Sequence, residues 1–229
     1  MFWIDYWYIV LVLPAVLLGL IAQIKVKSTF EKYSKEHSKR GLTAAQVARM
    51  ILDKNGLTDV RIEEVHGHLT DHFDPRTNVV RLSQSVYGSS SVAAIGVASH
   101  EVGHAIQYAR AYAPMKLRSA IIPITNIGAT TSPLLILLGL FMVYDPLIYV
   151  GIALYSTVAL FQLVTLPVEF NASRRAIDTL DSEGILGGEE INGARKVLGA
   201  AAMTYVTALV TSLMQILRLI LIFGGRRRD

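Results

Sequence analysis

Four long apolar stretches alternate with polar segments along this chain of 229 residues. A helix needs about 20 apolar residues to cross the roughly 30 Å hydrocarbon core of a bilayer, and each stretch is long enough to do so. Hydrophobic residues make up 52% of the sequence, and the mean hydropathy of +0.42 is high for an ordinary soluble domain. The pattern predicts a mainly α-helical, multi-pass membrane protein with helices at Tyr6 to Ile24, Ile121 to Tyr144, Leu147 to Val168 and Val197 to Phe223.

The segment 25–118 is polar enough to fold outside the membrane, and it carries both helix and strand patterns. Thr43-Ala44-Ala45-Gln46 has the form of a capping box, which predicts an amphipathic helix that ends near Asn55-Gly56. The serines at 89–91 can cap an Ala-rich helix over 92–109. The segment is therefore expected to be a small α+β module, with strands at Val60 to Val65, Leu69 to Phe73 and Asn78 to Leu82.

These elements divide the chain into five parts. The first apolar stretch begins after Asp5, the only early charge, and Lys25 follows it directly, so it is expected to be an uncleaved anchor and not a signal peptide. Tyr144-Asp145-Pro146 is expected to be the tight turn of a hairpin. The expected parts are a transmembrane anchor at 1–24, the module at 25–118, a transmembrane helical hairpin at 121–168, a helix and loop at 169–196, and a last transmembrane helix at 197–223.

Charge sets the expected orientation in the cell membrane. The net charge is +4, but the basic residues flank apolar stretches, which favours a lipid bilayer as the partner and excludes nucleic acid. The segment 25–40 holds six basic residues, so the positive-inside rule predicts a cytoplasmic module and an outside N-terminus. Four spans then place the C-terminus outside as well, which conflicts with the basic run Arg226-Arg227-Arg228. Arg218, near the end of the last span, is expected to snorkel to the interface.

The segment His100-Glu101-Val102-Gly103-His104 carries the strongest chemical signal. On a helix, His100 and His104 lie one turn apart on the same face, so their imidazoles can converge on one cation. Glu101 is rotated by about 100°, which suits a general base that takes a proton from zinc-activated water. The chain has no cysteine, so thiol catalysis and Cys-ligated zinc are excluded. The motif predicts one zinc ion per chain.

A zinc site needs a third protein ligand, and Glu169 is the predicted one. Pro167 suits the first turn of a helix, which would place Glu169 in that same turn. Small residues follow Glu169 and would let a second helix approach closely. Gly96 and Gly103 would allow the same close approach on the predicted helix over 92–109. The alternative is that Glu169 binds no metal and that its negative charge only stabilises the first turn of a helix through the helix dipole. The rival ligands are Asp178, Asp181 and Glu183.

Three further histidines, His66, His68 and His72, fall among the predicted strands and lack helical spacing. They are expected to be structural or surface residues, with His72 the one most suited to face the active site. His72 and Arg174 are candidates for stabilising an oxyanion. An edge strand beside the zinc helix could pair with an extended peptide, and Asn78 to Leu82 is predicted to do so.

Two stretches, His100 to Gln107 and Glu169 to Ala176, together with Leu69 to Arg76, resemble the bacterial membrane-bound neutral zinc metallopeptidases of the YugP-like family. More distantly, the sequence is similar to gluzincin peptidases of the HtpX and CAAX-protease type. The resemblance implies a zincin-like catalytic module with Glu101 as the catalytic residue. It also implies the zinc ligands His100, His104 and Glu169. The distant relatives carry an aspartate where this chain has Ser173, so a carboxylate that orients a ligand histidine is missing there or supplied elsewhere.

The sequence therefore predicts a membrane-embedded zinc endopeptidase that acts on protein or peptide substrates, membrane proteins among them. The alternative is a non-catalytic assembly or regulatory protein with a structural zinc site, against which Glu101 argues because such a site needs no base. A zinc transporter would need ionisable residues within the middle spans, and those spans have none apart from Asp145 in the turn.

Overall fold

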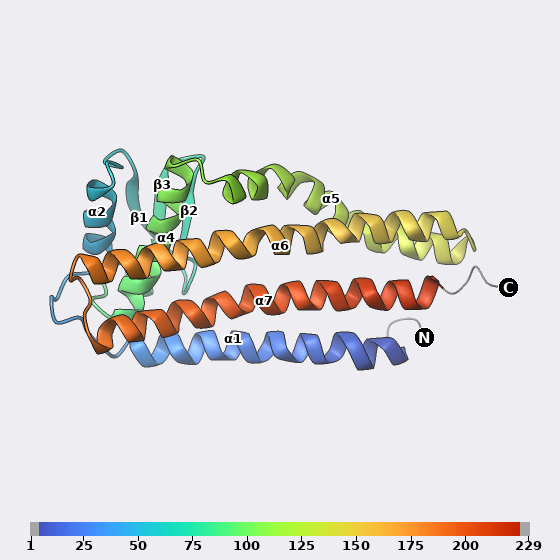
Figure 1. The fold of residues 1–229 in the computed structure, drawn as a ribbon, viewed down its shortest axis with the longest axis horizontal. Coiled ribbons are helices and arrows are strands. Elements are labelled where there is room, and N and C mark those ends of the chain that lie inside the picture. Colours follow the sequence, from blue (N-terminus) through green and yellow to red (C-terminus); the bar gives the residue numbers. More distant parts are fainter. Residues whose placement is uncertain (1–4, 225–229) are drawn as a thin grey trace. The chain divides into compact units, whose positions relative to one another are not determined.

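The computed structural model describes residues 5–224 (Figure 1), and within them the chain is mainly helical with one small sheet. A π-helical turn at Tyr8–Val12 leads into α1. The helices are α1 (Leu13–Tyr33), α2 (Ala44–Lys54), α3 (Gln84–Tyr87), α4 (Val92–Ala109), α5 (Ala113–Phe141), α6 (Asp145–Ser182) and α7 (Glu189–Phe223), and the strands are β1 (Arg61–Val65), β2 (His72–Asp74) and β3 (Val79–Ser83).

Four helical segments are long and apolar enough to cross a membrane, as predicted: Tyr8–Tyr33, Ala113–Phe141, Asp145–Ser182 and Glu189–Phe223. The chain forms two compact units, each described by itself. The helical unit consists of residues 5–23, 117–166 and 203–224, and the sheet unit consists of residues 24–116 and 167–202.

The prediction of a helix start at Pro167 is wrong, because Pro167 lies inside the continuous helix α6. A proline in a helix interior removes one backbone hydrogen bond, which apolar, well-packed helices tolerate. The residues after Pro167 are good helix formers, and the helix ends only before Gly184, whose φ is +57°. The second hairpin helix and the helix that carries Glu169 are therefore one element.

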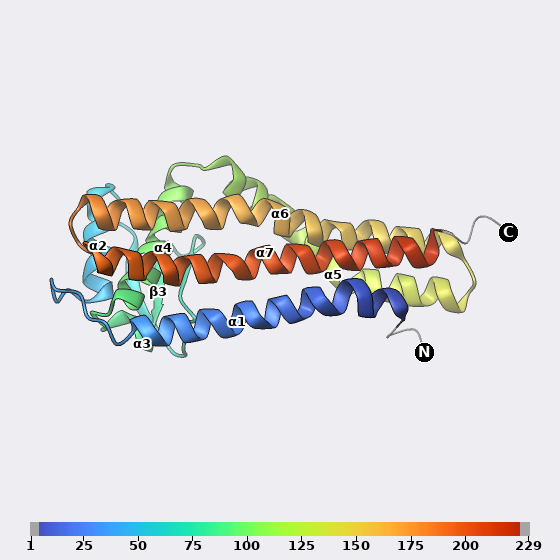
Figure 2. The same cartoon turned by 60° about the horizontal axis from the view of Figure 1, so that its bottom comes forward.

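In the sheet unit, β3 is the central strand of the order β1-β3-β2. It pairs in parallel with β1 and antiparallel with β2. The strand predicted at Leu69 to Phe73 is shorter and begins later, at His72, because Gly67 and Leu69 have positive φ values of 115° and 56° and form a loop. Figures 1 and 2 show α4 alongside β3 in both views.

Helices α2 and α4 of this unit begin where the sequence predicts. Thr43 and Gln46 form the capping box of α2, with the Gln46 backbone N–H 3.3 Å from Thr43 Oγ1 and the Thr43 backbone N–H 2.9 Å from Gln46 Oε1. Ser91 Oγ caps α4 by accepting from the Ala94 backbone N–H at 3.2 Å. Helix α4 spans the predicted residues, and most of its side chains lie in the core of the unit.

Close approach of two helices explains Gly103. A Cβ atom at this position would lie 2.8 Å from the backbone oxygen and 3.2 Å from the Cα of Ala172 on α6. A side chain would push the helices apart, so the glycine lets the face of α4 that carries the histidines lie directly against α6. The expectation of a close-approaching backbone at this glycine is confirmed.

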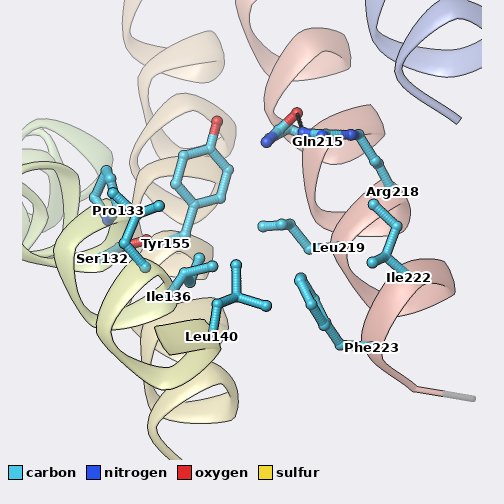
Figure 3. A pocket seen from close by; sticks show the side chains of 11 residues that line it. Ser132, Pro133, Ile136, Leu140, Tyr155, Gln215, Arg218, Leu219, Ile222 and Phe223 are labelled. Atoms are coloured by element: carbon cyan, nitrogen blue, oxygen red, sulfur yellow. Dashed lines mark hydrogen bonds between the residues drawn. The ribbon is translucent and has the colours of Figure 1, made fainter. Parts of the chain in front are cut away.

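In the helical unit, α6 and α7 pack together through Ile148, Ile152, Leu219 and Phe223. A cavity of about 210 Å³ lies among α5, α6 and α7 (Figure 3). Its walls are mostly apolar, while Tyr155, Gln215 and Arg218 line its polar end. The snorkelling predicted for Arg218 is wrong, because Arg218 is 8% exposed and pairs with Asp5.

Candidate metal centre and active site

Helix α4 presents His100 and His104 one turn apart. Their rings meet edge to face, with centroids 4.6 Å apart and an interplanar angle of 85°. Both side chains are largely buried, at 15% and 10% exposure. The Nε2 atoms of the two rings point to the same place, where a third group from another helix meets them.

That third group is Glu169 on α6. Its Oε2 atom lies 3.3 Å from His100 Nε2 and 3.5 Å from His104 Nε2, and its side chain is 3% exposed. One ligand atom from each of the three residues lies within 4.8 Å of the other two. Among residues 5–224, no other group of three or more His, Cys, Asp or Glu side chains is gathered closely enough to hold a metal ion.

The chemistry of these donors suits zinc. Two imidazole nitrogens and one carboxylate oxygen are ligands that zinc prefers, and three protein ligands leave a fourth position for water or substrate. The other ring nitrogens are already engaged: His100 Nδ1 lies 3.1 Å from Ser173 Oγ, and His104 Nδ1 lies 3.0 Å from Gln107 Oε1. Metal-binding histidines are usually held in this way, by a partner at the nitrogen that does not face the metal.

The electrostatics of the site favour a cation. Burial alone lowers the pKa of His104, but the hydrogen bond with Glu169 and the negative charges of Glu101 and Glu169 outweigh it. The pKa of His104 therefore lies above its ordinary value. The same negative charges that favour a proton on His104 would also favour a divalent cation at this point.

Glu101 lies next to His100 in the sequence but is not part of the three-residue group. Its Oε2 atom accepts from the backbone N–H of Phe73 on β2 at 3.1 Å, and the residue is 9% exposed. Nearby, Asp71 accepts from the backbone N–H of Ser83 at 2.7 Å. Burial raises the pKa of Asp71, and the charge of Glu101 adds to that effect. Glu101 is thus held between α4 and β2 of the sheet.

The three histidines of the predicted strand region make contacts away from this group. His66 Nδ1 lies 3.1 Å from Gln84 Nε2, and the ring of His68 meets Phe30 edge to face at 5.6 Å. The exposed His72 has its Nδ1 atom 2.9 Å from the Thr70 carbonyl oxygen. The rival carboxylates Asp178, Asp181 and Glu183 are also outside the group, and Glu183 pairs with Lys54. Arg174 is exposed on α6.

The prediction that substrate pairs with Asn78 to Leu82 is wrong. The corresponding strand, β3, already has β1 on one side and β2 on the other, so neither edge is open. The edge strand nearest to the motif glutamate is β2, whose Phe73 N–H reaches Glu101. Local alternation of polar and apolar residues identifies strands, but it carries no information about their order in a sheet.

Three polar residues near the histidines had no assigned role in the sequence analysis. Gln107 is fully buried on α4, and its Nε2 atom donates to the Val168 carbonyl oxygen at 2.8 Å and to Asn171 Oδ1 at 3.0 Å. Asn171 Oδ1 also accepts from Arg175 Nε at 2.8 Å. The available signal was spacing: Gln107 follows His104 by three residues, and Asn171 and Arg175 are one turn apart on a helix.

The fold and the site together define a class: a multi-pass membrane protein with a two-histidine, one-glutamate candidate metal centre on a His-Glu-x-x-His helix. Residues 8–224 match the family described as "Putative neutral zinc metallopeptidase", and the chain belongs to this family. It is 51% identical over 222 residues to a Bacillus subtilis (strain 168) protein named "Putative membrane protease YugP", which covers 97% of this chain and 99% of the relative. No solved structure matches the chain.

Proposed function

We propose that this protein is a membrane-embedded zinc endopeptidase. The observation that carries the proposal is the convergence of His100, His104 and Glu169 at a buried point beside Glu101. Membership of a zinc metallopeptidase family and the similarity to a membrane protease support it. The four apolar helices support a location in the cell membrane.

In this proposal the three ligands hold one zinc ion per chain. A bound zinc ion acts as a Lewis acid that polarises a substrate carbonyl and lowers the pKa of water. His100 and His104 supply Nε2 atoms, which requires that each ring carry its proton on Nδ1. Glu169 supplies a carboxylate oxygen and the negative charge that partly neutralises the metal.

Glu101 is the proposed general base. Its carboxylate accepts a proton from the water that attacks the peptide carbonyl and then delivers that proton to the leaving amine. The hydrogen bond from the Phe73 N–H supports this role, because it fixes the carboxylate in the gap between α4 and β2. His72, on the same strand, and Arg174 remain candidates for stabilising the oxyanion.

The outer edge of β2 is the proposed binding edge for an extended peptide. The Phe73 N–H points to Glu101 and therefore away from β3, so the same edge can offer backbone groups to a peptide beside the base. A photoreactive residue at His72 should then crosslink a peptide substrate, whereas the same residue at Glu64 on β1 should not. Equal crosslinking at both strands would count against β2.

The sheet unit is proposed to face the cytoplasm because of the basic segment 25–40. A reporter enzyme that is active only outside the cytoplasm, inserted after Arg40, should stay inactive. An active reporter would reverse the orientation without touching the chemistry of the site.

Replacement of the base tests the function itself. Glu101→Gln keeps the size of the side chain but removes its ability to take a proton, so cleavage of an unfolded protein substrate should fall by about 10²-fold or more. Zinc content, measured on the detergent-purified protein, should stay near that of the wild type because no ligand is lost. Glu64→Gln, an exposed substitution on β1, is the matched control. Full activity of Glu101→Gln would rule out Glu101 as the base. A zinc-loaded wild type that cleaves no substrate would instead favour the structural-zinc alternative.

A further inference from the structure

Gln107 holds the two helices of the metal centre together. It is fully buried, and its amide bridges from His104 on α4 to Val168 and Asn171 on α6. An amide can present either its oxygen or its NH2 group to a neighbour, so the orientation has to be inferred from partners whose roles are fixed.

Two such partners exist on α6. The Val168 carbonyl oxygen, 2.8 Å from the Gln107 amide nitrogen, can only accept a hydrogen bond. Arg175 can only donate, so the Asn171 atom 2.8 Å from its Nε must be the amide oxygen. That oxygen lies 3.0 Å from the Gln107 amide nitrogen, which must therefore donate to it. Both partners require the NH2 group of Gln107 to face α6.

The consequence reaches His104. With its NH2 group directed to α6, Gln107 presents Oε1 to His104 Nδ1 at 3.0 Å. An oxygen can only accept there, so Nδ1 must carry a proton, and in the neutral ring the lone pair belongs to Nε2, the nitrogen that faces Glu169. We propose that Gln107 is a positioning residue that fixes the metal-binding tautomer of His104, with its own orientation set by Val168 and, through Asn171, by Arg175.

His100 is held differently. Its Nδ1 faces the hydroxyl of Ser173 at 3.1 Å, and a hydroxyl can donate or accept by rotating. Ser173 therefore constrains the position of the ring but leaves its tautomer free. Of the two histidines, His104 is the one whose Nδ1 is committed to a proton, so only its Nε2 can serve as a metal ligand. The inference rests on the zinc site of the proposed function.

The test uses the zinc-loaded, full-length protein in detergent with ¹⁵N-labelled histidine. In the wild type, His104 should show a slowly exchanging Nδ1–H signal. Gln107→Met keeps the length of the side chain but offers no oxygen, so the signal should be lost and the zinc dissociation constant, measured against a competing chelator, should rise about 10- to 100-fold. Gln107→Glu restores the acceptor for His104 but loses the donor to α6, so the signal should persist while zinc affinity recovers only part of that loss.

Arg175→Leu is the second variant and leaves the centre itself intact. Val168 still orients Gln107, so the His104 signal should remain, and zinc affinity should fall by less than in Gln107→Met. Arg195→Leu removes an exposed arginine on α7 and is the matched control, with no change expected. A wild-type signal and affinity in Gln107→Met would overturn the inference, as would equal losses in Gln107→Met and Gln107→Glu. An unchanged affinity in Arg175→Leu would remove Arg175 from the chain of contacts.

One further variant separates this inference from the function it rests on. His104→Ala should abolish zinc binding. If it binds zinc normally, the metal site itself is wrong. If it loses zinc while Gln107→Met behaves as the wild type, only the positioning role of Gln107 is wrong.

Discussion

Each unit of the molecule contains a cluster of buried or partly buried ionisable side chains, and the two clusters are built differently. In the helical unit, Arg218 Nε donates to Asp5 Oδ2 at 2.9 Å, the guanidinium lies 5.4 Å from the centre of the Tyr8 ring, and Gln215 Oε1 accepts at 3.4 Å. The donor and the acceptors belong to the same cluster, and the two formal charges cancel.

In the sheet unit, the atoms that converge are two imidazole Nε2 atoms and the Glu169 carboxylate. None of them is an obligatory donor, because an imidazole nitrogen either carries a proton or offers a lone pair. Such a cluster is stable only when a proton or a metal ion joins it. The comparison teaches that burial and charge alone do not mark a site; possible metal-ligand atoms that gather at one point without an arginine or lysine among them do.

The largest expected effect is a loss of bound zinc, and it should follow the removal of a residue from the sheet-unit cluster but not from the helical-unit cluster. Glu169→Ala, like His100→Ala, should reduce zinc from about one ion per chain to nearly none, because the two remaining ligands bind zinc poorly. Asp5→Asn should leave zinc content unchanged, since that cluster needs no metal. Metal analysis of the purified variants is the measurement. Zinc retained by Glu169→Ala would move the third ligand elsewhere, with Asp178 and Glu183 as the next residues to test.

The second effect concerns the packing that brings Glu169 to the histidines. Gly103→Ala places a methyl group 2.8 Å from the Ala172 carbonyl oxygen, so α4 and α6 must separate, at a cost of about 1–3 kcal/mol in stability. Zinc binding should weaken in the same variant. Gly199→Ala on α7 meets no atom within 4 Å and should be neutral or stabilising by up to about 1 kcal/mol. Thermal unfolding and zinc titration of both variants are the measurements. If Gly103→Ala has the stability and zinc affinity of the wild type, the close contact between Gly103 and Ala172 is not needed for either.

The sequence predicted the parts of this site that depend on local pattern. The serine cap and the absence of proline defined α4, and helical spacing placed His100 and His104 on one face. Hydropathy found all four long helices. These predictions succeed because each depends on residues within a few turns of one another.

The rest depended on contacts between distant segments. The continuation of α6 through Pro167 and the central place of β3 are decided by packing and pairing partners that the local pattern does not contain. Gln107 was missed for the same reason. It is one polar residue on an apolar helix, and the partners that give it a role, Asn171 and Arg175, lie on another helix.

The third effect concerns the contribution of the Asp5–Arg218 ion pair to the stability of the helical unit. Arg218→Leu leaves Asp5 without its partner and should cost about 1–2 kcal/mol, between the values for exposed and fully buried ion pairs. The double variant Asp5→Leu/Arg218→Leu should recover much of that stability, because no charge is then stranded. Thermal unfolding in detergent measures both. A double variant that loses the sum of the two single losses would mean that the residues act independently.

The smallest expected effect is a change in zinc affinity when the partner of His100 Nδ1 is replaced. Ser173→Asp replaces a hydroxyl that can donate or accept by a carboxylate that can only accept, so the His100 Nδ1 proton gains a stronger, charged partner. Zinc should bind up to about 10-fold more tightly. Ser173→Ala should weaken zinc binding, and Ser182→Ala, further along α6, should not change it. The measurement is the zinc dissociation constant by chelator competition on folded protein. If the aspartate variant binds zinc no more tightly than the wild type, the hydroxyl already orients His100 as well as a carboxylate does.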